Sequence, residues 1–268
     1  HLLCEASCIH ADKDPRIICI NREKYISQQF DDIIFLDSYS FLPKSLDGLV
    51  KSLVHSTVIK HPEYFKNVKK DKGYLNSKEV LSIIVDKCPS FFKHTINYFK
   101  GCMPKEYIYY SLRKGFFPYE HYDKIERCVE TECFQQVDFN DTLNDSKISQ
   151  EDYDRNVVQL WNDLKFKNKG DYLKFYNICD VVLLADVIEA FREKSMTGFG
   201  LDPMNSYLTL PSLAWDCLLK KTDIEIEPMT DLNQFLWLEK FAKRGGVSQI
   251  FSRRLRANNP EMTGFDMK

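Results

Sequence analysis

The chain has 268 residues, of which 44% are hydrophobic and 13% aromatic, so it is long enough to bury a sizeable core in one or two domains. No apolar run approaches the ~20 residues of a membrane-spanning helix, and we expect no membrane partner. The nine cysteines are odd in number and irregularly spaced, which argues against a disulfide framework. They favour a reducing intracellular compartment, the nucleus or the cytoplasm.

Charge is segregated along the chain, although its formal net charge is only -2. Lys60 to Lys114 carries 12 Lys and Arg against 5 Asp and Glu, a net of +7. Glu120 to Asp154 carries 3 Lys and Arg against 11 Asp and Glu, a net of -8. Such blocks are typical of nucleic-acid contact beside a metal site, and a solvated lysine-rich surface explains the basic block equally well.

The first ten residues contain four zinc-type ligands, His1, Cys4, Cys8 and His10. Structural zinc sites usually take their ligands as two separated pairs, and this spacing does not fit that pattern. We therefore assign no metal here. The sequence begins without an initiator Met, a basic start or an apolar signal core, which leads us to expect a fragment or an incomplete gene.

Two short β-rich runs follow, Arg16 to Asn21 and Asp32 to Asp37, and we predict strands of one sheet. The second run leads into Asp37-Ser38-Tyr39-Ser40-Phe41-Leu42-Pro43. In the simplest interpretation, Ser38 starts a turn after the strand. The next segment, Ser45 to Ser56, has the pattern of a short amphipathic helix.

The stretch from His61 to Tyr110 is aromatic and lysine-rich but has no clear period, so we interpret about residues 55–110 as an insertion. Aromatic side chains pack in cores more often than they stack on bases. The residues concerned are Phe91, Phe92, Tyr98, Phe99, Tyr107, Tyr109 and Tyr110.

Two helices are predicted further along. Ser149 to Lys165 begins with a capping-box pattern, Ser149 followed by Asp152. Asp171 to Phe191 is a long amphipathic helix with a carboxylate, Asp180, in the middle of its apolar face. A buried carboxylate needs a cation, a metal or several donors, so either a divalent metal or a structural Arg or backbone cap accounts for it. The face is formed by Leu173, Tyr176, Leu184, Val187 and Phe191.

Glycines at 198 and 200 interrupt this pattern, and we place a domain boundary near Gly200. Helices are predicted from Leu210 to about Lys220 and after Asp231. A basic stripe then runs from Lys240 to Arg256 without an intervening acid, and it carries six positive charges in seventeen residues. Paired glycines within the stripe allow the backbone to approach a phosphate. The alternative is a glycine turn between solvated arginines.

Several motifs, taken in order, resemble those of family B DNA polymerases of the protein-primed type, found in phages and in Polinton-type transposons or viruses. Tyr176-Asn177-Ile178-Cys179-Asp180 resembles their third exonuclease motif, Tyr-x-x-x-Asp. Lys114-Gly115-Phe116-Phe117-Pro118-Tyr119 resembles the signature that precedes it, and this run is the more specific of the two. Ser38 to Leu42 and Arg244-Gly245-Gly246 match two further motifs in part, with Tyr39 in place of Leu and Ala242 in place of Tyr.

The resemblance implies roles for individual residues. Tyr176, Asp180 and Lys114 would be catalytic at a 3′–5′ exonuclease site, with Asp180 as a metal ligand. We expect these three residues and Ser38 to converge on one cleft, with the Asp171 to Phe191 helix packed on the sheet. The residues that would contact nucleic acid are Ser38, Tyr39, Leu42, Lys243, Arg244, Gly245, Gly246, Arg253 and Arg254.

The implied fold class is α/β (α+β). Residues 1–199 would be the C-terminal part of a ribonuclease H-like exonuclease domain, and residues 200–268 the helical start of a polymerase domain. The parent would use Mg²⁺ or Mn²⁺ and bind DNA, as primer-template and single strand, deoxynucleotides and a terminal protein primer.

The first two exonuclease motifs do not appear before Phe35, where the resemblance would place them, and the polymerase motifs lie outside the chain. Two-metal hydrolysis needs several carboxylates, so we expect this chain alone to be inactive. The alternatives are a degenerate nuclease-like module that binds nucleic acid and a structural or interaction protein with coincidental motifs.

Overall fold

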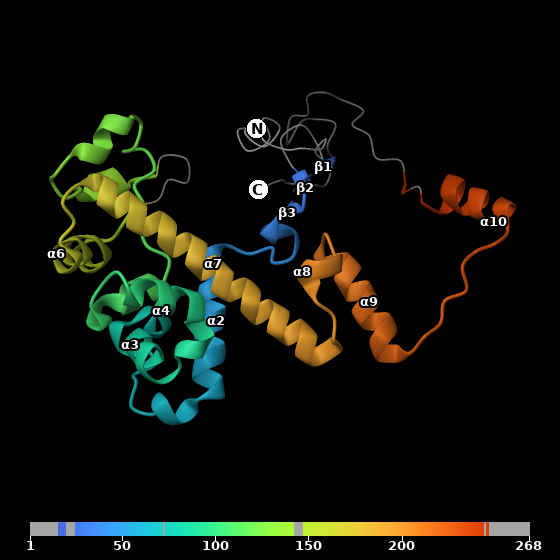
Figure 1. Ribbon diagram of the computed structural model, residues 1–268, viewed down its shortest axis with the longest axis horizontal. Helices are drawn as coiled ribbons and strands as arrows, with labels where there is room; N and C mark the ends of the chain where they lie inside the picture. The colour runs from blue at the N-terminus through green and yellow to red at the C-terminus, as the bar shows by residue number, and fades with distance from the viewer. Residues whose placement is uncertain (1–15, 20–24, 72, 142–146, 244, 247–268) are drawn as a thin grey trace, which may run out of the picture. The chain divides into compact units, whose positions relative to one another are not determined.

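The computed structural model describes residues 16–19, 25–71, 73–141, 147–243 and 245–246 (Figure 1). The described part is a mixed α+β fold in which helices predominate over one small antiparallel sheet. The chain divides into two compact units, the first ending at Thr222 and the second beginning at Asp223. Gly200, where the sequence suggested a boundary, lies inside the first unit.

The sheet has three strands in the order β1 (Arg16–Cys19), β2 (Tyr25–Phe30) and β3 (Ile33–Leu36). The two predicted strands, β1 and β3, are confirmed, but they do not pair with each other because β2 lies between them. The sequence of β2, with Ser27 and two glutamines, has no apolar run and therefore gave no strand signal.

Both faces of the sheet carry exposed apolar side chains. Ile17 and Ile18 on β1, which point to opposite faces, are both exposed, as are Ile33, Ile34 and Phe35 on β3. The described residues therefore do not form a helix layer over this sheet, and the prediction that the 171–191 helix packs on it is wrong. That helix packs against other helices instead.

Helix α7 (Lys169–Phe199) is the longest element of the chain, with 31 residues. It begins where the Asn168 side chain accepts a hydrogen bond from the backbone N–H of Asp171, and it ends at Gly200 in the left-handed conformation, with φ of 65°. At 1.5 Å per residue it spans about 46 Å. The predicted helix is confirmed and extends further at both ends.

The buried face of α7 is rotated slightly from the predicted one: Tyr176 and Val187 belong to both, whereas Leu173, Leu184 and Phe191 are only half-buried. Tyr172, Tyr176, Cys179, Leu183 and Val187 are buried. This rotation leaves Asp180 at the edge of the face rather than in its middle. The sequence could not fix the rotation because apolar residues occur around much of the helix, and several neighbouring elements contact it.

Several elements that contact α7 come from the segment interpreted as an insertion or, in the case of α2 (Leu46–Lys60), lie mainly just before it. Helices α2, α4 (Lys93–Lys100) and η5 (Lys105–Leu112) all contact α7, and their buried side chains belong to the same core. The predicted core role is confirmed for Phe92, Phe99, Tyr109 and Tyr110, whereas Tyr98 is exposed. The helices here are short and alternate with 3-10 turns, which hides a 3.6-residue period.

At the N-terminal end of α7 lies an aromatic cluster around Phe134, which is almost fully buried. Its ring contacts the rings of Trp161 and Tyr172. The Nζ of Lys169 is also buried there, 2.5 Å from a Glu130 carboxylate oxygen. This hydrogen bond lowers the pKa of Glu130 to about 2, so the ion pair persists at neutral pH, and the stability it contributes declines as the pH falls from 4.5 towards that value.

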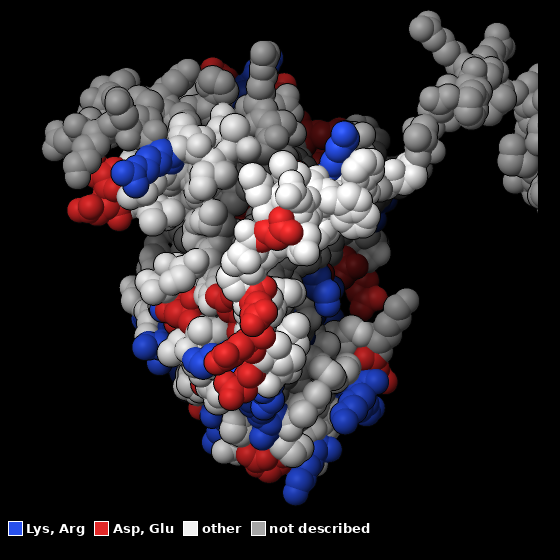
Figure 2. Space-filling model, turned by 90° about the vertical axis from the view of Figure 1, so that its right-hand side faces the viewer, with Lys and Arg blue, Asp and Glu red and all other residues white. Residues whose placement is uncertain are grey.

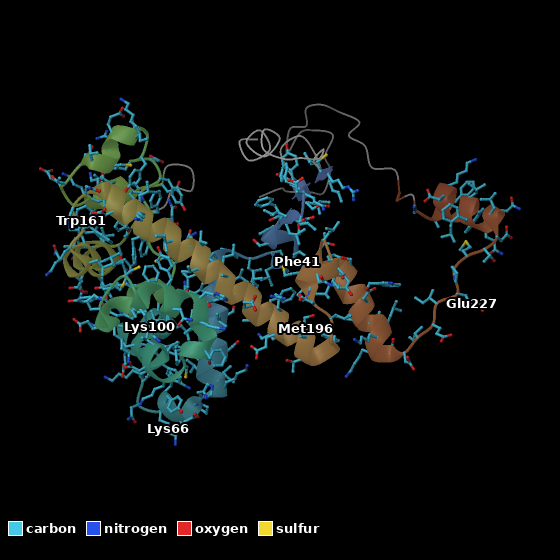
Figure 3. All side chains as sticks on the ribbon, viewed as in Figure 1. Phe41, Lys66, Lys100, Trp161, Met196 and Glu227 are labelled. Carbon is cyan, nitrogen blue, oxygen red and sulfur yellow. The ribbon has the colours of Figure 1, made fainter. Side chains whose placement is uncertain are left out.

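The C-terminal half of α7 is covered from a different part of the chain. Phe41 is fully buried, and its ring centroid lies 6.4 Å from that of Phe191. Figure 3 shows Trp161 near one end of α7, Met196 near the other, and Phe41 beside the second half. α7 thus packs against the aromatic cluster around Phe134 at its N-terminal end and against Phe41 in its C-terminal half.

The remaining predicted helices are also confirmed, as Ser149 caps α5 and Asp231 caps α10. The Ser149 to Lys165 helix is divided by a π-helical turn, η8 (Asp154–Val158). No helix among the described residues is both long and apolar enough to cross a membrane. The other elements are α3 (Lys78–Lys87), α5 (Gln150–Tyr153), α6 (Gln159–Leu164), α8 (Pro203–Ser206), α9 (Leu210–Thr222), α10 (Leu232–Trp237), η1 (Ser38–Ser40), η2 (Pro62–Tyr64), η3 (Tyr74–Asn76), η4 (Pro89–Phe92), η6 (Ile125–Val129), η7 (Gln136–Phe139) and η9 (Leu238–Ala242).

A buried carboxylate fastens α4 to α7. Asp186 of α7 is 3% exposed, and its two oxygens accept hydrogen bonds from the backbone N–H groups of His94 (2.7 Å) and Thr95 (3.0 Å). These N–H groups belong to the first turn of α4, where the helix leaves its donors without intrahelical partners. Asp186 therefore caps α4 from a position 92 residues away in sequence.

We expect Asp186→Ala to lower the free energy of unfolding by about 2–4 kcal/mol, because a cap is lost and buried N–H groups are left without acceptors. Urea denaturation followed by circular dichroism measures this. Glu193→Ala, an exposed position on the same helix, is the matched control and should change stability by less than about 0.5 kcal/mol. Equal effects from both substitutions would contradict the capping role.

Candidate functional site

The candidate site lies where the segment after η5 crosses α7. η5 ends at Leu112. Shortly after it, the Nζ of Lys114 lies 3.2 Å from the Oδ2 of Asp180 on α7. Both side chains are partly shielded, at 29% and 27% exposure. The two residues lie 66 positions apart in sequence, so their meeting is a property of the fold.

The Tyr176 ring lies beside this ion pair. The Lys114 Nζ is 5.7 Å from its centroid, within the range of a cation–π interaction. Phe117 stacks on the same ring at 4.5 Å, and the Tyr119 hydroxyl lies 3.1 Å from the Tyr176 hydroxyl. The Gly115 backbone passes so close that a Cβ there would sit 3.5 Å from the ring. The whole motif thus folds around Tyr176.

Burial keeps the phenol of Tyr176 protonated. It raises the pKa of Tyr176 well above its ordinary value, and the hydrogen bond with Tyr119 and the charge of Asp180 act in the same direction. Tyr176 is therefore neutral at physiological pH and keeps a proton to donate. A neutral phenol beside an ammonium group suits the binding of an anionic oxygen.

Asp180 retains one unused oxygen. Its Oδ2 accepts from Lys114, whereas its Oδ1 is buried and has no hydrogen-bond partner among the residues the structure describes. Such orphaned acceptors are uncommon in folded proteins and call for a donor or a cation. Asp180 is thus able to contribute one ligand to a metal ion.

The metal centre itself does not fit the described residues. Within residues 16–246, apart from the gaps in that range, no group of three or more His, Cys, Asp and Glu side chains is arranged to hold a metal ion. Two-metal hydrolysis requires several carboxylates around ions ~4 Å apart, and Asp180 supplies one. We therefore derive no catalytic step through Mg²⁺ or Mn²⁺.

A pocket of about 770 Å³ opens beside Tyr176 and Lys114. Its wall comes from the segment after η5, from α7 and from η8, and it includes both charged and aromatic side chains. The volume lies within the range of small-molecule sites in proteins, roughly 300–1,000 Å³. The candidate site is therefore accessible to a ligand of nucleotide size.

The predicted primer-binding residues lie elsewhere on the first unit. Ser38 and Tyr39 belong to η1, where the Asp37 carboxylate accepts from the Tyr39 N–H, and the Tyr39 ring is exposed. Leu42 packs against the core. In the described part, none of the three is joined to Lys114, Tyr176 or Asp180 by a hydrogen bond or an ion pair.

The predicted basic stripe is described only at its beginning. Lys243 pairs with Glu239 one helical turn earlier, so its charge is partly offset, and Gly245 and Gly246 are exposed. Arg244, Arg253 and Arg254 lie outside the described residues, as do His1, Cys4, Cys8 and His10. On the face shown in Figure 2, basic and acidic side chains lie next to one another rather than in separate fields.

The prediction missed two groups of residues around the site. Phe117 and Tyr119 enclose Tyr176, and their place in the Lys114 to Tyr119 motif could have indicated this. Arg113 and Arg155 line the pocket, but they are far apart in sequence and match no motif. Only the fold brings them to one wall.

A double-mutant cycle tests the ion pair. We expect Lys114→Met and Asp180→Asn to show a coupling energy of about 1 kcal/mol in urea denaturation, since the pair is partly shielded from water. The cycle of Lys66→Met with Asp180→Asn is the control, because Lys66 is exposed and lies outside the pocket lining. A coupling no larger than this control would show that the pair does not form in solution.

The chain matches no protein-family model, and neither a curated protein nor a solved structure shows significant similarity to it. Its functional interpretation therefore rests on its own residues and their geometry. The likeness to family B DNA polymerases remains a prediction made from motifs.

Proposed function

We propose that this chain is part of a protein-primed-type family B DNA polymerase and carries the C-terminal portion of its 3′–5′ exonuclease site. The observation that supports this most is the 3.2 Å contact between Lys114 and Asp180, with Tyr176 alongside. The two motifs that contain these residues are far apart in sequence, with 57 positions between Tyr119 and Tyr176. They nevertheless meet around the Tyr176 ring.

Each of the three side chains has a task in this proposal. Lys114 supplies a positive charge beside a phosphate of the DNA strand, and the neutral phenol of Tyr176 donates a hydrogen bond to a phosphate oxygen. Asp180 holds Lys114 in place through Oδ2 and offers Oδ1 to a metal ion or a donor of the substrate. The ion would supply charge stabilisation and an activated water when bound.

The second candidate function is nucleic-acid binding without catalysis, by a degenerate nuclease-like module. The observation that favours it is that the described residues offer no group of three or more ligands for a metal ion, and Asp180 alone cannot hold two ions. Both proposals place a DNA strand at Lys114. They differ in whether further carboxylates complete the site in the protein.

In either case we expect the isolated chain neither to extend a primer nor to degrade single-stranded DNA in the presence of Mg²⁺ or Mn²⁺. Gel analysis of end-labelled oligonucleotides measures both activities. Asp180→Ala protein serves as the background control, since it removes the remaining carboxylate. Degradation by the unmodified chain that EDTA and Asp180→Ala both abolish would mean that the described site is already complete.

Photocross-linking tests whether the site receives a 3′ end. Single-stranded oligonucleotides with 4-thiothymidine at the 3′ terminus should cross-link to peptides containing Tyr119 or Tyr176, and those with the label at the 5′ terminus should do so several-fold less. Lys114→Ala should reduce the 3′ cross-link, because the phosphate loses its cation. Lys66→Ala removes the same charge elsewhere and should leave it unchanged.

Equal cross-linking from both ends, or cross-links insensitive to Lys114→Ala, would contradict the exonuclease proposal. The complete absence of DNA cross-links at low salt would favour the third possibility, a structural or interaction protein.

A further inference from the structure

The pocket beside Tyr176 contains two arginines that the proposed exonuclease site does not use. Arg113 lies in the extended segment after η5, and Arg155 lies in the π-helical turn η8. Isolated π-helical turns are rare and occur frequently at functional sites. The two guanidinium groups reach the same pocket from segments about 40 residues apart.

These two arginines differ from the other cations of the pocket in their ion pairing. The other two cations of the pocket have partners, since Lys51 pairs with Asp47 and Lys114 with Asp180. No ion pair to Arg113 or Arg155 occurs within the described part of the chain. Arg113 instead lies over the Tyr110 ring, 5.5 Å from its centroid.

The acids near the arginines are engaged or exposed. Both oxygens of Asp152 accept hydrogen bonds, one from the Asn156 amide and one from the Ser149 hydroxyl. Glu151 also lines the pocket, but its side chain is exposed to water. Burial lowers the pKa of the Arg113 guanidinium, and the charge of Arg155 lowers it further, so a bound anion would relieve a repulsion.

The side chain of Asn156 is further evidence for a ligand, and this evidence does not depend on charge. Asn156 is 8% exposed and lines the pocket, and its Nδ2 donates to Asp152 at 3.1 Å. Its Oδ1 is buried and has no donor among the described residues. Leaving such an acceptor unpaired is costly, so a ligand N–H or O–H group facing it would be favoured.

We propose that this pocket binds a nucleotide, with its phosphate between Arg113 and Arg155 and a donor of its base or sugar on the Oδ1 of Asn156. The pocket volume of about 770 Å³ accommodates such a ligand. Guanidinium groups are well suited to phosphate because they donate two parallel hydrogen bonds. The proposal does not depend on the exonuclease role of Lys114 and Asp180. A free mononucleotide and the phosphorylated end of a strand share the chemistry required.

Isothermal titration of the full chain with dAMP tests the proposal, with adenosine and inorganic phosphate as comparison ligands. We expect saturable binding of dAMP, and weaker binding of the other two because each lacks half of the recognised groups. Arg155→Gln should weaken dAMP binding about tenfold or more, since a charge-assisted hydrogen bond is lost. Arg155 is exposed, so this variant should fold normally.

Lys66→Gln is the matched control and should bind dAMP like the unmodified chain. A 5′-phosphorylated oligonucleotide distinguishes the two sources: binding tighter than dAMP and sensitive to Arg155→Gln would identify a strand end, and equal or weaker binding a free nucleotide. No saturable binding of dAMP, equal binding of dAMP and inorganic phosphate, or equal behaviour of Arg155→Gln and Lys66→Gln would overturn the proposal. None of these results bears on the cross-link at Lys114, so the two proposals fail separately.

Discussion

The burial of one face of α7 is the constraint on which the first unit depends. The helix carries many apolar side chains that are costly to expose to water, and the surrounding elements cover it from several sides. Phe41 covers its second half, α4 is fastened to it by Asp186, and the aromatic cluster around Phe134 covers its start. Tyr176 and Asp180 therefore stand on a rigid support, as a binding site requires.

The helices of the chain were largely predictable, because caps and periodic apolar residues are local signals. Ser45, Ser149 and Asp231 all start helices in the structure as their sequence contexts indicated. Strand β2 was not predictable, since a polar run becomes a strand there only by pairing with neighbours on both sides. The helices between residues 61 and 110 were not predicted for the related reason that short helices separated by 3-10 turns show no sustained period.

The residues of the candidate site also fall into two groups, those that the sequence predicted and those that it did not. Lys114, Tyr176 and Asp180 were predicted because they lie within motifs, and the structure brings the three together. Arg113, Arg155 and Asn156 carry no local signal, since an arginine in sequence is most often a solvated surface charge. Their significance follows from the tertiary structure: the three residues share a pocket, and within the described part of the chain the arginines have no acidic partner and the Asn156 Oδ1 has no donor.

The segment of about residues 55–110 is physically connected to the pocket through η5. η5 contributes Tyr110, whose hydroxyl donates to Asp163 and whose ring lies under Arg113, and the chain continues directly from there to Lys114. Adjacent residues thus line one pocket in different roles: Arg113 belongs to the proposed nucleotide site, and Lys114 forms the ion pair with Asp180. The packing of η5 on the core therefore fixes the positions of both cations, which gives this segment a role in the site as well as in stability.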